Sequence, residues 1–415
     1  MVEVGFWVSW RDIYEKTADK VFEKLAKYNV SRASIFVVAE GKVFFKPKDK
    51  YFTETKLKPV KGCKRDLLAE CVEASREYGL KLTATVVCVV DPLHAEKNPE
   101  CRLIDFRGSP HPRALCPNNP DVQKYLRGLA ENIAYEYEVD EVELDYIRFK
   151  RSREGFLLPT HLLIGRHCYC SFCREKAVEK GLDWKSFEKI IEMFKTISET
   201  SHENLKYLKM FLGSTGDLNR FYLEHPEVAD WLRFRAESVK ELIAFIKESV
   251  EKSGVALSAD LFYPTLSWQV GQDYSLLREV LDTVKPMIYT ARMGAWETKY
   301  IKSILDRVGW EYEDLLLETI SHLLGVNKPS SVKDFEYYGL PPEIASREAL
   351  KVAEYIDPSR IYVGLYSGYD PSIVYNPPRR LLDAIKEALK INPKGLYFFS
   401  FSNTPEENFE VISRL

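Results

Sequence analysis

The chain has 415 residues, and 45% hydrophobic residues are enough to build a large core. Its 59 basic and 62 acidic residues give a net charge of −3 without a basic stripe or tail, which argues against nucleic-acid binding. No apolar run is long enough to cross a membrane, and no secretory leader precedes the first predicted strand, so we expect a cytoplasmic protein with no membrane partner. Lysine and glutamate are abundant and glutamine is scarce, which is typical of thermophilic proteins.

Short apolar segments bounded by turn residues recur along the chain and predict eight strands. Continuous apolar runs of this kind suit parallel strands that are covered on both faces. In chain order, the strands are predicted over residues 4–10, 34–39, 82–90, 139–149, 255–262, 284–289, 361–366 and 395–401.

Helical patterns fill the intervals between these strands. After the first strand, Asp12 can cap a helix that runs to about Tyr28, and residues 91–117 read as a long loop. After the fourth strand, residues 150–228 read as a charged, cysteine-containing helical insertion, and a long amphipathic helix begins at residue 229.

This alternation of strands and helices is typical of parallel βα units, and closure at eight strands predicts an α/β fold, the (β/α)8 TIM barrel. We expect residues 1–415 to form one barrel domain, with the insertion at 150–228 inside it. A doubly wound open sheet is the alternative. No glycine-rich phosphate loop follows the first strand, so nucleotide binding is not favoured.

The fourth strand carries two acidic residues of the same parity, Glu143 and Asp145. Side chains alternate across a strand, so both carboxylates point to one face, which we take to be the barrel interior. A buried carboxylate is costly without a partner, and functional residues of such barrels lie at the C-terminal ends of the strands. The sequence therefore predicts a catalytic acid here. The competing interpretation is an ordinary strand end with a salt bridge to Arg148.

A cysteine motif follows that strand, Cys168-Tyr169-Cys170-Ser171-Phe172-Cys173. Eight cysteines in a cytoplasmic chain favour metal ligands or core thiols over a disulfide framework. Three thiolates at this spacing are typical of a structural zinc site, which needs a fourth ligand. Buried or redox-active thiols without a metal are the alternative.

Cys116 is the first choice for the fourth ligand. It precedes the helix that leads into the fourth strand, and the loops on either side of that strand are neighbours in a barrel. His167 and Cys101 are the second and third choices.

The cysteine pattern, from Cys116-Pro117-Asn118-Asn119-Pro120 to the motif at 168–173, resembles the zinc-bearing β-galactosidases of the barrel glycosidases. In that family, the corresponding four cysteines hold a structural zinc. The chain departs from it at the end of strand four, where Leu144-Asp145 stands in place of Asn-Glu. The family's acid/base glutamate and its β-galactosidase activity are therefore not carried over.

A broader resemblance covers strands three to six, about half of the chain. The segments 144–149, 258–262, 271–273 and 285–289 are similar to those of glycoside-hydrolase-like barrels. This resemblance implies a glycosidase that acts on an oligo- or polysaccharide.

Glycoside hydrolysis uses two carboxyl groups that flank the scissile bond. We expect Asp145 to be the nucleophile or charge stabiliser and Asp260, on the adjacent strand, to be its partner and acid/base. Glu143, one layer deeper, would orient Asp145 or meet Arg148. If Glu143 and Asp145 are close, the pKa of one of them should rise.

Polar and aromatic residues near strand ends are candidates for the substrate site. Trp7 and Trp10 could stack on sugar faces, and the residues expected to line the site are Tyr146, Arg148, Tyr289 and Tyr366. Each tyrosine could instead be a core residue.

Two other functions compete with a glycosidase. One is a metal-dependent hydrolase or lyase, although no His-x-His pair follows strand one. The other is a non-catalytic carbohydrate-binding barrel, since one fold serves many functions. The sequence leaves open whether the chain forms a homo-oligomer.

Overall fold

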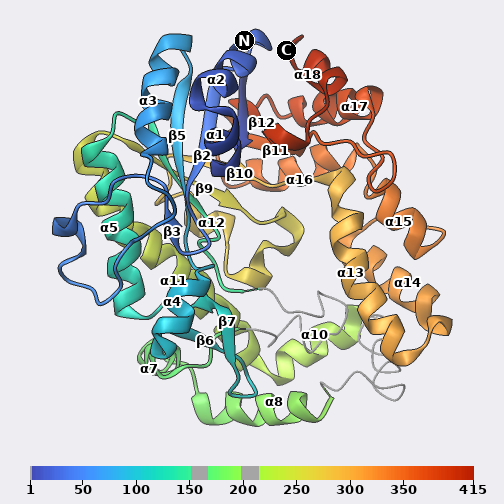
Figure 1. Cartoon of the computed structure of the whole chain (residues 1–415). Coiled ribbons are helices and arrows are strands. Elements are labelled where there is room, and N and C mark those ends of the chain that lie inside the picture. The colour runs from blue at the N-terminus through green and yellow to red at the C-terminus, as the bar shows by residue number, and fades with distance from the viewer. Residues whose placement is uncertain (1, 151–166, 198–214) are drawn as a thin grey trace.

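Eight parallel strands form a closed barrel in the centre of the molecule (Figure 1). The computed structural model describes residues 2–150, 167–197 and 215–415. The strands are hydrogen-bonded in the order β10-β9-β8-β5-β2-β1-β12-β11, and bridges from Val284 to Ile361 and from Met287 to Gly364 join the two end strands. The predicted (β/α)8 barrel is confirmed. Its strands are β1 (Glu3–Val8), β2 (Arg32–Ala39), β5 (Lys81–Val87), β8 (Glu141–Asp145), β9 (Ala256–Leu261), β10 (Thr283–Pro286), β11 (Tyr362–Tyr366) and β12 (Gly395–Phe399).

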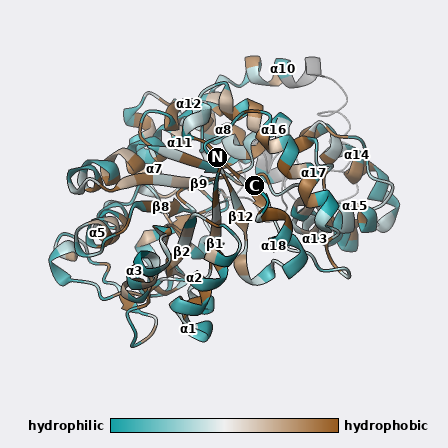
Figure 2. Cartoon of the chain, turned by 90° about the horizontal axis from the view of Figure 1, so that it is seen from above, coloured by the Kyte–Doolittle hydropathy of each residue, from teal (hydrophilic) through white to brown (hydrophobic). Residues whose placement is uncertain are grey.

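Helices surround the strands, and hydrophobic strands lie at the centre with hydrophilic helix faces outside (Figure 2). None of the described helices is long and apolar enough to span a bilayer. The α-helices are α1 (Trp10–Lys16), α2 (Ala18–Lys27), α3 (Leu67–Tyr78), α4 (Pro92–Lys97), α5 (Pro120–Glu136), α7 (Ser171–Glu179), α8 (Trp184–Ile197), α10 (Thr215–Glu224), α11 (Pro226–Val250), α12 (Tyr274–Leu277), α13 (Thr290–Val308), α14 (Glu313–Leu324), α15 (Val332–Tyr338), α16 (Ile344–Ala353), α17 (Pro378–Leu389) and α18 (Glu406–Ile412).

The single helix predicted after the first strand is wrong. Ser9 caps α1, since its side chain accepts a hydrogen bond from the backbone N–H of Arg11, and Asp12 lies inside the helix. Thr17 then adopts a positive φ of 74°, outside the helical region, and separates α1 from α2. A local backbone conformation of this kind leaves the hydrophobic pattern intact, so the pattern alone did not reveal the break.

The loop predicted over residues 91–117 contains structure of its own. Besides α4, it forms an antiparallel hairpin of β6 (Arg102–Ile104) and β7 (Pro110–Leu115), while β3 (Lys42–Val43) and β4 (Val60–Lys61) extend the sheet beside β2. After β8, α7, α8 and α10 fall within the predicted insertion, of which residues 151–166 and 198–214 lie outside the described residues.

The barrel interior is charged along β8. Alternation along this strand places Glu141, Glu143 and Asp145 on one face, and all three are buried. The ammonium group of Lys285, on β10, forms ion pairs with both Glu141 and Glu143 and donates a 3.2 Å hydrogen bond to Ser258. Lys285 is fully buried, so these pairs are shielded from water.

Glu141 gains a second cation from the neighbouring part of the barrel. Nη2 of Arg32 lies 3.2 Å from Oε2 of Glu141. Burial alone would raise the pKa of Glu141, but Lys285 and Arg32 outweigh it and lower this pKa to about 2. The lower half of the barrel therefore holds matched charges.

Replacing Lys285 with methionine should destabilise the protein by about 3–5 kcal/mol at pH 8, because two buried glutamates lose their shared cation. The loss should shrink toward pH 5, because the uncompensated carboxylates can then take up protons. Thermal unfolding across this pH range measures both effects. The matched control is Lys240→Met, which removes the surface pair with Glu279 and should cost less than about 1 kcal/mol. Equal losses in the two variants would contradict the prediction.

Candidate active site and metal centre

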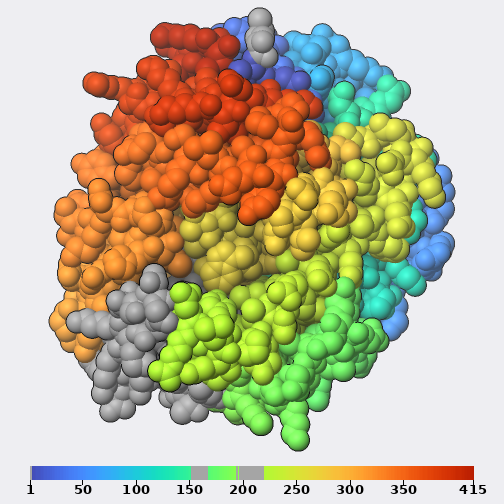
Figure 3. Space-filling view, turned by 180° about the vertical axis from the view of Figure 1, so that it is seen from behind, coloured from blue at the N-terminus to red at the C-terminus, as the bar shows by residue number. Residues whose placement is uncertain are grey.

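A cavity of about 380 Å³ opens at the C-terminal ends of the barrel strands. Its walls come from several strand ends, from the segments that follow β8, β9 and β10, and from α13. Figure 3 shows the surface hollowed between the yellow segment after β9 and the orange helices after β10. The lining residues are Trp7, Phe36, Val89, Asp145, Tyr146, Arg148, Phe149, Lys150, Asp260, Phe262, Tyr263, Met287, Tyr289, Met293, Trp296, Glu297, Lys299, Tyr300 and Phe399.

Asp145 and Asp260 line this cavity from neighbouring strands. The register pairs Leu144 with Ala259, so the next residue on each strand is one of the two aspartates. Adjacent strands lie about 4.8 Å apart, and both side chains are on the inward face. The barrel therefore brings two buried carboxyl groups together at its mouth.

The groups that act on the pKa differ between the two aspartates. Burial raises the pKa of Asp145 to about 7, although Arg148 and the backbone N–H of Tyr146, which donates at 2.7 Å, act to lower it. Burial followed by the nearby Glu143 and Asp145 raises the pKa of Asp260 well above its ordinary value, against a lowering by Lys285. Within the described part of the chain, Oδ1 of Asp260 has no hydrogen-bond partner. The largest neighbouring charge therefore favours the protonated form at Asp260, where it is Glu143, and the ionised form at Asp145, where it is Arg148.

Glu143 lies below the cavity and is bonded on all sides. Besides its ion pair with Lys285, it accepts hydrogen bonds from Nε1 of Trp7 at 3.1 Å, from Thr85 at 2.7 Å and from Ser34 at 3.2 Å. Its cation is Lys285 and not Arg148, the residue expected to meet it. Arg148 instead lies 4.6 Å from the ring centroids of both Tyr146 and Phe262.

The aromatic residues predicted for the substrate site divide between the cavity and the surrounding packing. Trp7, Tyr146 and Tyr289 line the cavity. Tyr146 follows Asp145 directly and has a positive φ of 53°, a strained conformation for a tyrosine. Tyr366 is buried beside them without lining the cavity, and Trp10 stacks on Phe44 at 4.1 Å, outside the lining set.

One wall of the cavity was missed from the sequence. The first half of α13 contributes Met293, Trp296, Glu297 and Tyr300, which are spaced as one face of a helix. Glu297 is a buried carboxyl group at only 1% exposure. The signal was present, since this periodic run begins directly after the sixth strand, at the end where barrel sites lie.

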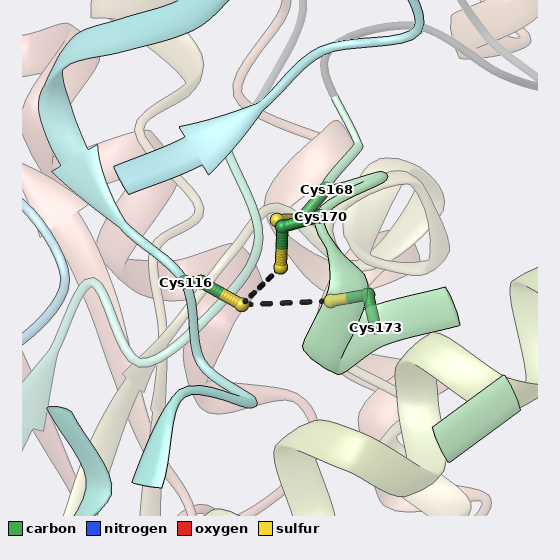
Figure 4. Close-up of side chains that lie close together, drawn as sticks. All are labelled: Cys116, Cys168, Cys170 and Cys173. Atoms are coloured by element: carbon green, nitrogen blue, oxygen red, sulfur yellow. Dashed lines mark hydrogen bonds between the residues drawn. The ribbon is translucent and has the colours of Figure 1, made fainter. Parts of the chain in front are cut away.

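The four predicted cysteines form a cluster (Figure 4). The sulfur atoms of Cys116, Cys168, Cys170 and Cys173 all lie within 4.8 Å of one another, and none is in a disulfide. Sγ of Cys116 is 3.5 Å from Sγ of both Cys170 and Cys173. Four thiolates bound tetrahedrally to zinc at 2.3 Å would lie roughly 3.8 Å apart, so the donor set fits such an ion.

Local structure explains why these cysteines meet. Cys116 directly follows β7, and Cys170 and Cys173 lie at the start of α7. Asn118 joins the two segments, because its backbone N–H points at the sulfur of Cys116 (3.4 Å) and its side chain donates to the sulfur of Cys173 (3.3 Å).

The two alternatives to Cys116 fall outside the cluster. Nδ1 of His167 accepts a hydrogen bond from Trp231, and Cys101 contacts Cys116 through its backbone carbonyl, which accepts a 2.8 Å hydrogen bond from the N–H of Cys116. None of the four clustered cysteines lines the active-site cavity.

Solved structures with the same fold include three carbohydrate-active proteins of low sequence identity. The glycoside hydrolase domain of PgaB (BpsB) from Bordetella bronchiseptica has a TM-score of 0.56 at 11% identity, and the match covers 99% of both chains. A β-galactosidase from the Antarctic haloarchaeon Halorubrum lacusprofundi has a TM-score of 0.57 at 11% identity, covering 99% of this chain and 57% of that one. Alpha-L-fucosidase isoenzyme 2 from Paenibacillus thiaminolyticus has a TM-score of 0.55 at 13% identity, covering 100% and 48%. The chain spans about half the length of the last two proteins.

A search of curated protein sequences gives no significant match. A family model described as "Putative glycosyl hydrolase domain" matches residues 8–303, which is more than half of the chain, so the protein belongs to this glycosyl hydrolase family.

Proposed function

We propose that the protein hydrolyses a glycosidic bond in an oligo- or polysaccharide, with Asp145 and Asp260 as its paired carboxyl groups. The observation that carries this proposal is the position of both groups, buried on neighbouring strands and lining one cavity at the barrel mouth. Burial raises the pKa values of both groups, and different neighbouring charges act on each, as expected of an acid and a base with separate roles.

The roles follow from which group keeps its proton. Asp260 is the general acid that protonates the leaving oxygen, because burial and the neighbouring carboxylates of Glu143 and Asp145 favour its protonated form. Asp145 acts in its ionised form, as nucleophile or as the charge that stabilises the oxocarbenium-like transition state. Side chains from adjacent strands suit a separation of about 5 Å, the spacing of retaining enzymes. Glu143 holds Trp7 and Lys285 in place beneath this pair.

Aromatic side chains give the cavity its affinity for sugars in this proposal. Trp7, Tyr146, Tyr289 and Trp296 surround the carboxyl pair, and sugar rings offer apolar faces that pack against such rings. Arg148 supplies a cation beside Asp145. Tyr366 and Trp10 are packing residues here, since neither lines the cavity.

The cysteine cluster holds a structural zinc ion in this proposal. Four thiolates leave no open coordination position, so the ion would supply cross-linking and no catalytic step. It would fix the start of α7 to the end of β7. The same geometry disfavours a metal-dependent hydrolase or lyase built on this cluster, because the cysteines lie away from the cavity.

Asparagine at position 145 or 260 should reduce turnover by about 10²–10⁴-fold while leaving the fold intact. The assay is reducing-sugar release from a panel of oligo- and polysaccharides at elevated temperature. Asp314→Asn, which changes an exposed aspartate that pairs with Lys328, is the matched control and should retain full activity. Sugar binding without release by the wild type would favour the non-catalytic barrel. Undiminished release by both site variants would remove the aspartates from the chemistry.

The dependence of kcat/KM on pH should have an acid limb near pH 7. Activity should rise with pH as Asp145, whose pKa is raised to about 7, loses its proton. At higher pH, it should fall again as Asp260 ionises, since burial and the neighbouring carboxylates raise the pKa of this acid well above its ordinary value. Initial rates measured from pH 4 to 10 in a constant-ionic-strength buffer test this shape. Full activity at pH 5 would show that the ionised form of Asp145 is not required.

Purified wild-type protein should contain about one zinc ion per chain, and Cys170→Ser should lose it, because a four-thiolate site loses a ligand. Elemental analysis by mass spectrometry after exhaustive dialysis measures the content. Cys63→Ser changes a half-buried cysteine outside the cluster and should leave the metal content unchanged. A metal-free wild type would contradict the proposed site.

A further inference from the structure

A buried arginine on α11 faces the loop that carries the cysteines. Trp231, Arg235 and Ser238 lie on one face of this helix, at spacings of four and three residues. Trp231 stacks on Tyr169 with ring centroids 5.1 Å apart. Ser238 accepts a 3.2 Å hydrogen bond from the Asn118 amide group that also contacts the sulfur of Cys173. Arg235 therefore sits between two contacts to the cysteine cluster.

The charge of Arg235 has little visible compensation. Its side chain is fully buried, and Nη2 donates a 2.8 Å hydrogen bond to the carbonyl oxygen of Gln269. Nε and Nη1 have no hydrogen-bond partner in the described part of the chain, and no carboxylate there forms an ion pair with this guanidinium. An unpaired buried charge is expensive, so a nearby group must carry the opposite charge.

The groups that can supply it belong to the cysteine loop. The neighbours of Arg235 on α11 contact that loop on both sides, since Trp231 stacks on Tyr169 and Ser238 accepts from the Asn118 amide group that also contacts Cys173. A divalent ion held by four thiolates keeps an excess of negative charge, which a buried guanidinium can balance.

We propose that Arg235 is the counter-charge of the metal–thiolate centre and the residue that ties this centre to the active-site loops. The tie is direct, because the guanidinium lies 4.9 Å from the ring centroid of Phe149, a residue that lines the cavity. The N–H of Phe149 donates to the carbonyl of Val270 at 2.9 Å, next to Gln269. Arg235 thus contacts the segments that follow Asp145 and Asp260 and acts as a positioning residue. This inference rests on the metal site proposed above and is independent of the hydrolytic activity.

Zinc affinity is the first test, measured by competition with a chromophoric chelator. Arg235→Met should weaken zinc binding by about ten- to a hundredfold. This is the range for residues that interact with the metal ligands without binding the metal themselves. Arg235→Lys should recover part of that loss, since it keeps the charge. Arg233→Met removes an exposed arginine of the same helix, one that pairs with Asp230, and should bind zinc like the wild type.

Thermal unfolding with and without zinc is the second test, and it separates a counter-charge from a packing role. Arg235→Met should lower the midpoint temperature of unfolding of the zinc-loaded protein. In chelator-treated protein, the same change should leave this midpoint unchanged or raise it, because without zinc the cysteines no longer hold the negative charge that Arg235 balances. Equal lowering in both states, with unchanged zinc affinity of both Arg235 variants, would overturn the proposal while leaving the metal site standing. Wild-type protein that binds no zinc would overturn both, whatever its glycosidase activity.

Discussion

The ion pairs of Lys285 with Glu141 and Glu143 determine the electrostatics of the whole barrel interior. With Arg32, this lysine compensates the glutamates of β8, which could not stay ionised in the core without partners. One level higher the compensation stops, because in the described residues neither Asp145 nor Asp260 forms a salt bridge. Burial therefore raises the pKa values of both aspartates, and the nearby cations Arg148 and Lys285 only partly oppose it.

Along β8, the carboxyl groups that form ion pairs are therefore different from the one that lines the cavity. The lower carboxylates of β8 form ion pairs with Lys285 across the barrel, and the pKa of Glu141 is lowered to about 2, whereas Asp145 can change its protonation state near neutral pH. The cysteine cluster acts outside the barrel, where it joins α7 to the hairpin that precedes α5.

The sequence predicted the features that depend on local pattern. Apolar runs located all eight strands, and parity placed Glu143 and Asp145 inward. Cysteine spacing identified the motif at 168–173, and the expected neighbourhood of two barrel loops added Cys116 to it. It did not reveal the cation of Glu143, because Lys285 lies 142 residues away and meets it only through barrel closure. The sequence also led us to expect Trp10 near the substrate. Its stacking on Phe44 is a tertiary contact, which the hydrophobic periodicity of the sequence does not encode.

The wall that α13 contributes to the cavity bears on how such proteins diverge. The strands that carry the aspartates are bound by charge pairs and cannot change easily, whereas Met293, Trp296 and Tyr300 belong to a helix outside the barrel. Exchanges on that helical face would reshape the cavity without disturbing the interior ion pairs. Related barrels could therefore accept ligands of different shape while keeping the same strands and buried carboxyl groups beneath the cavity.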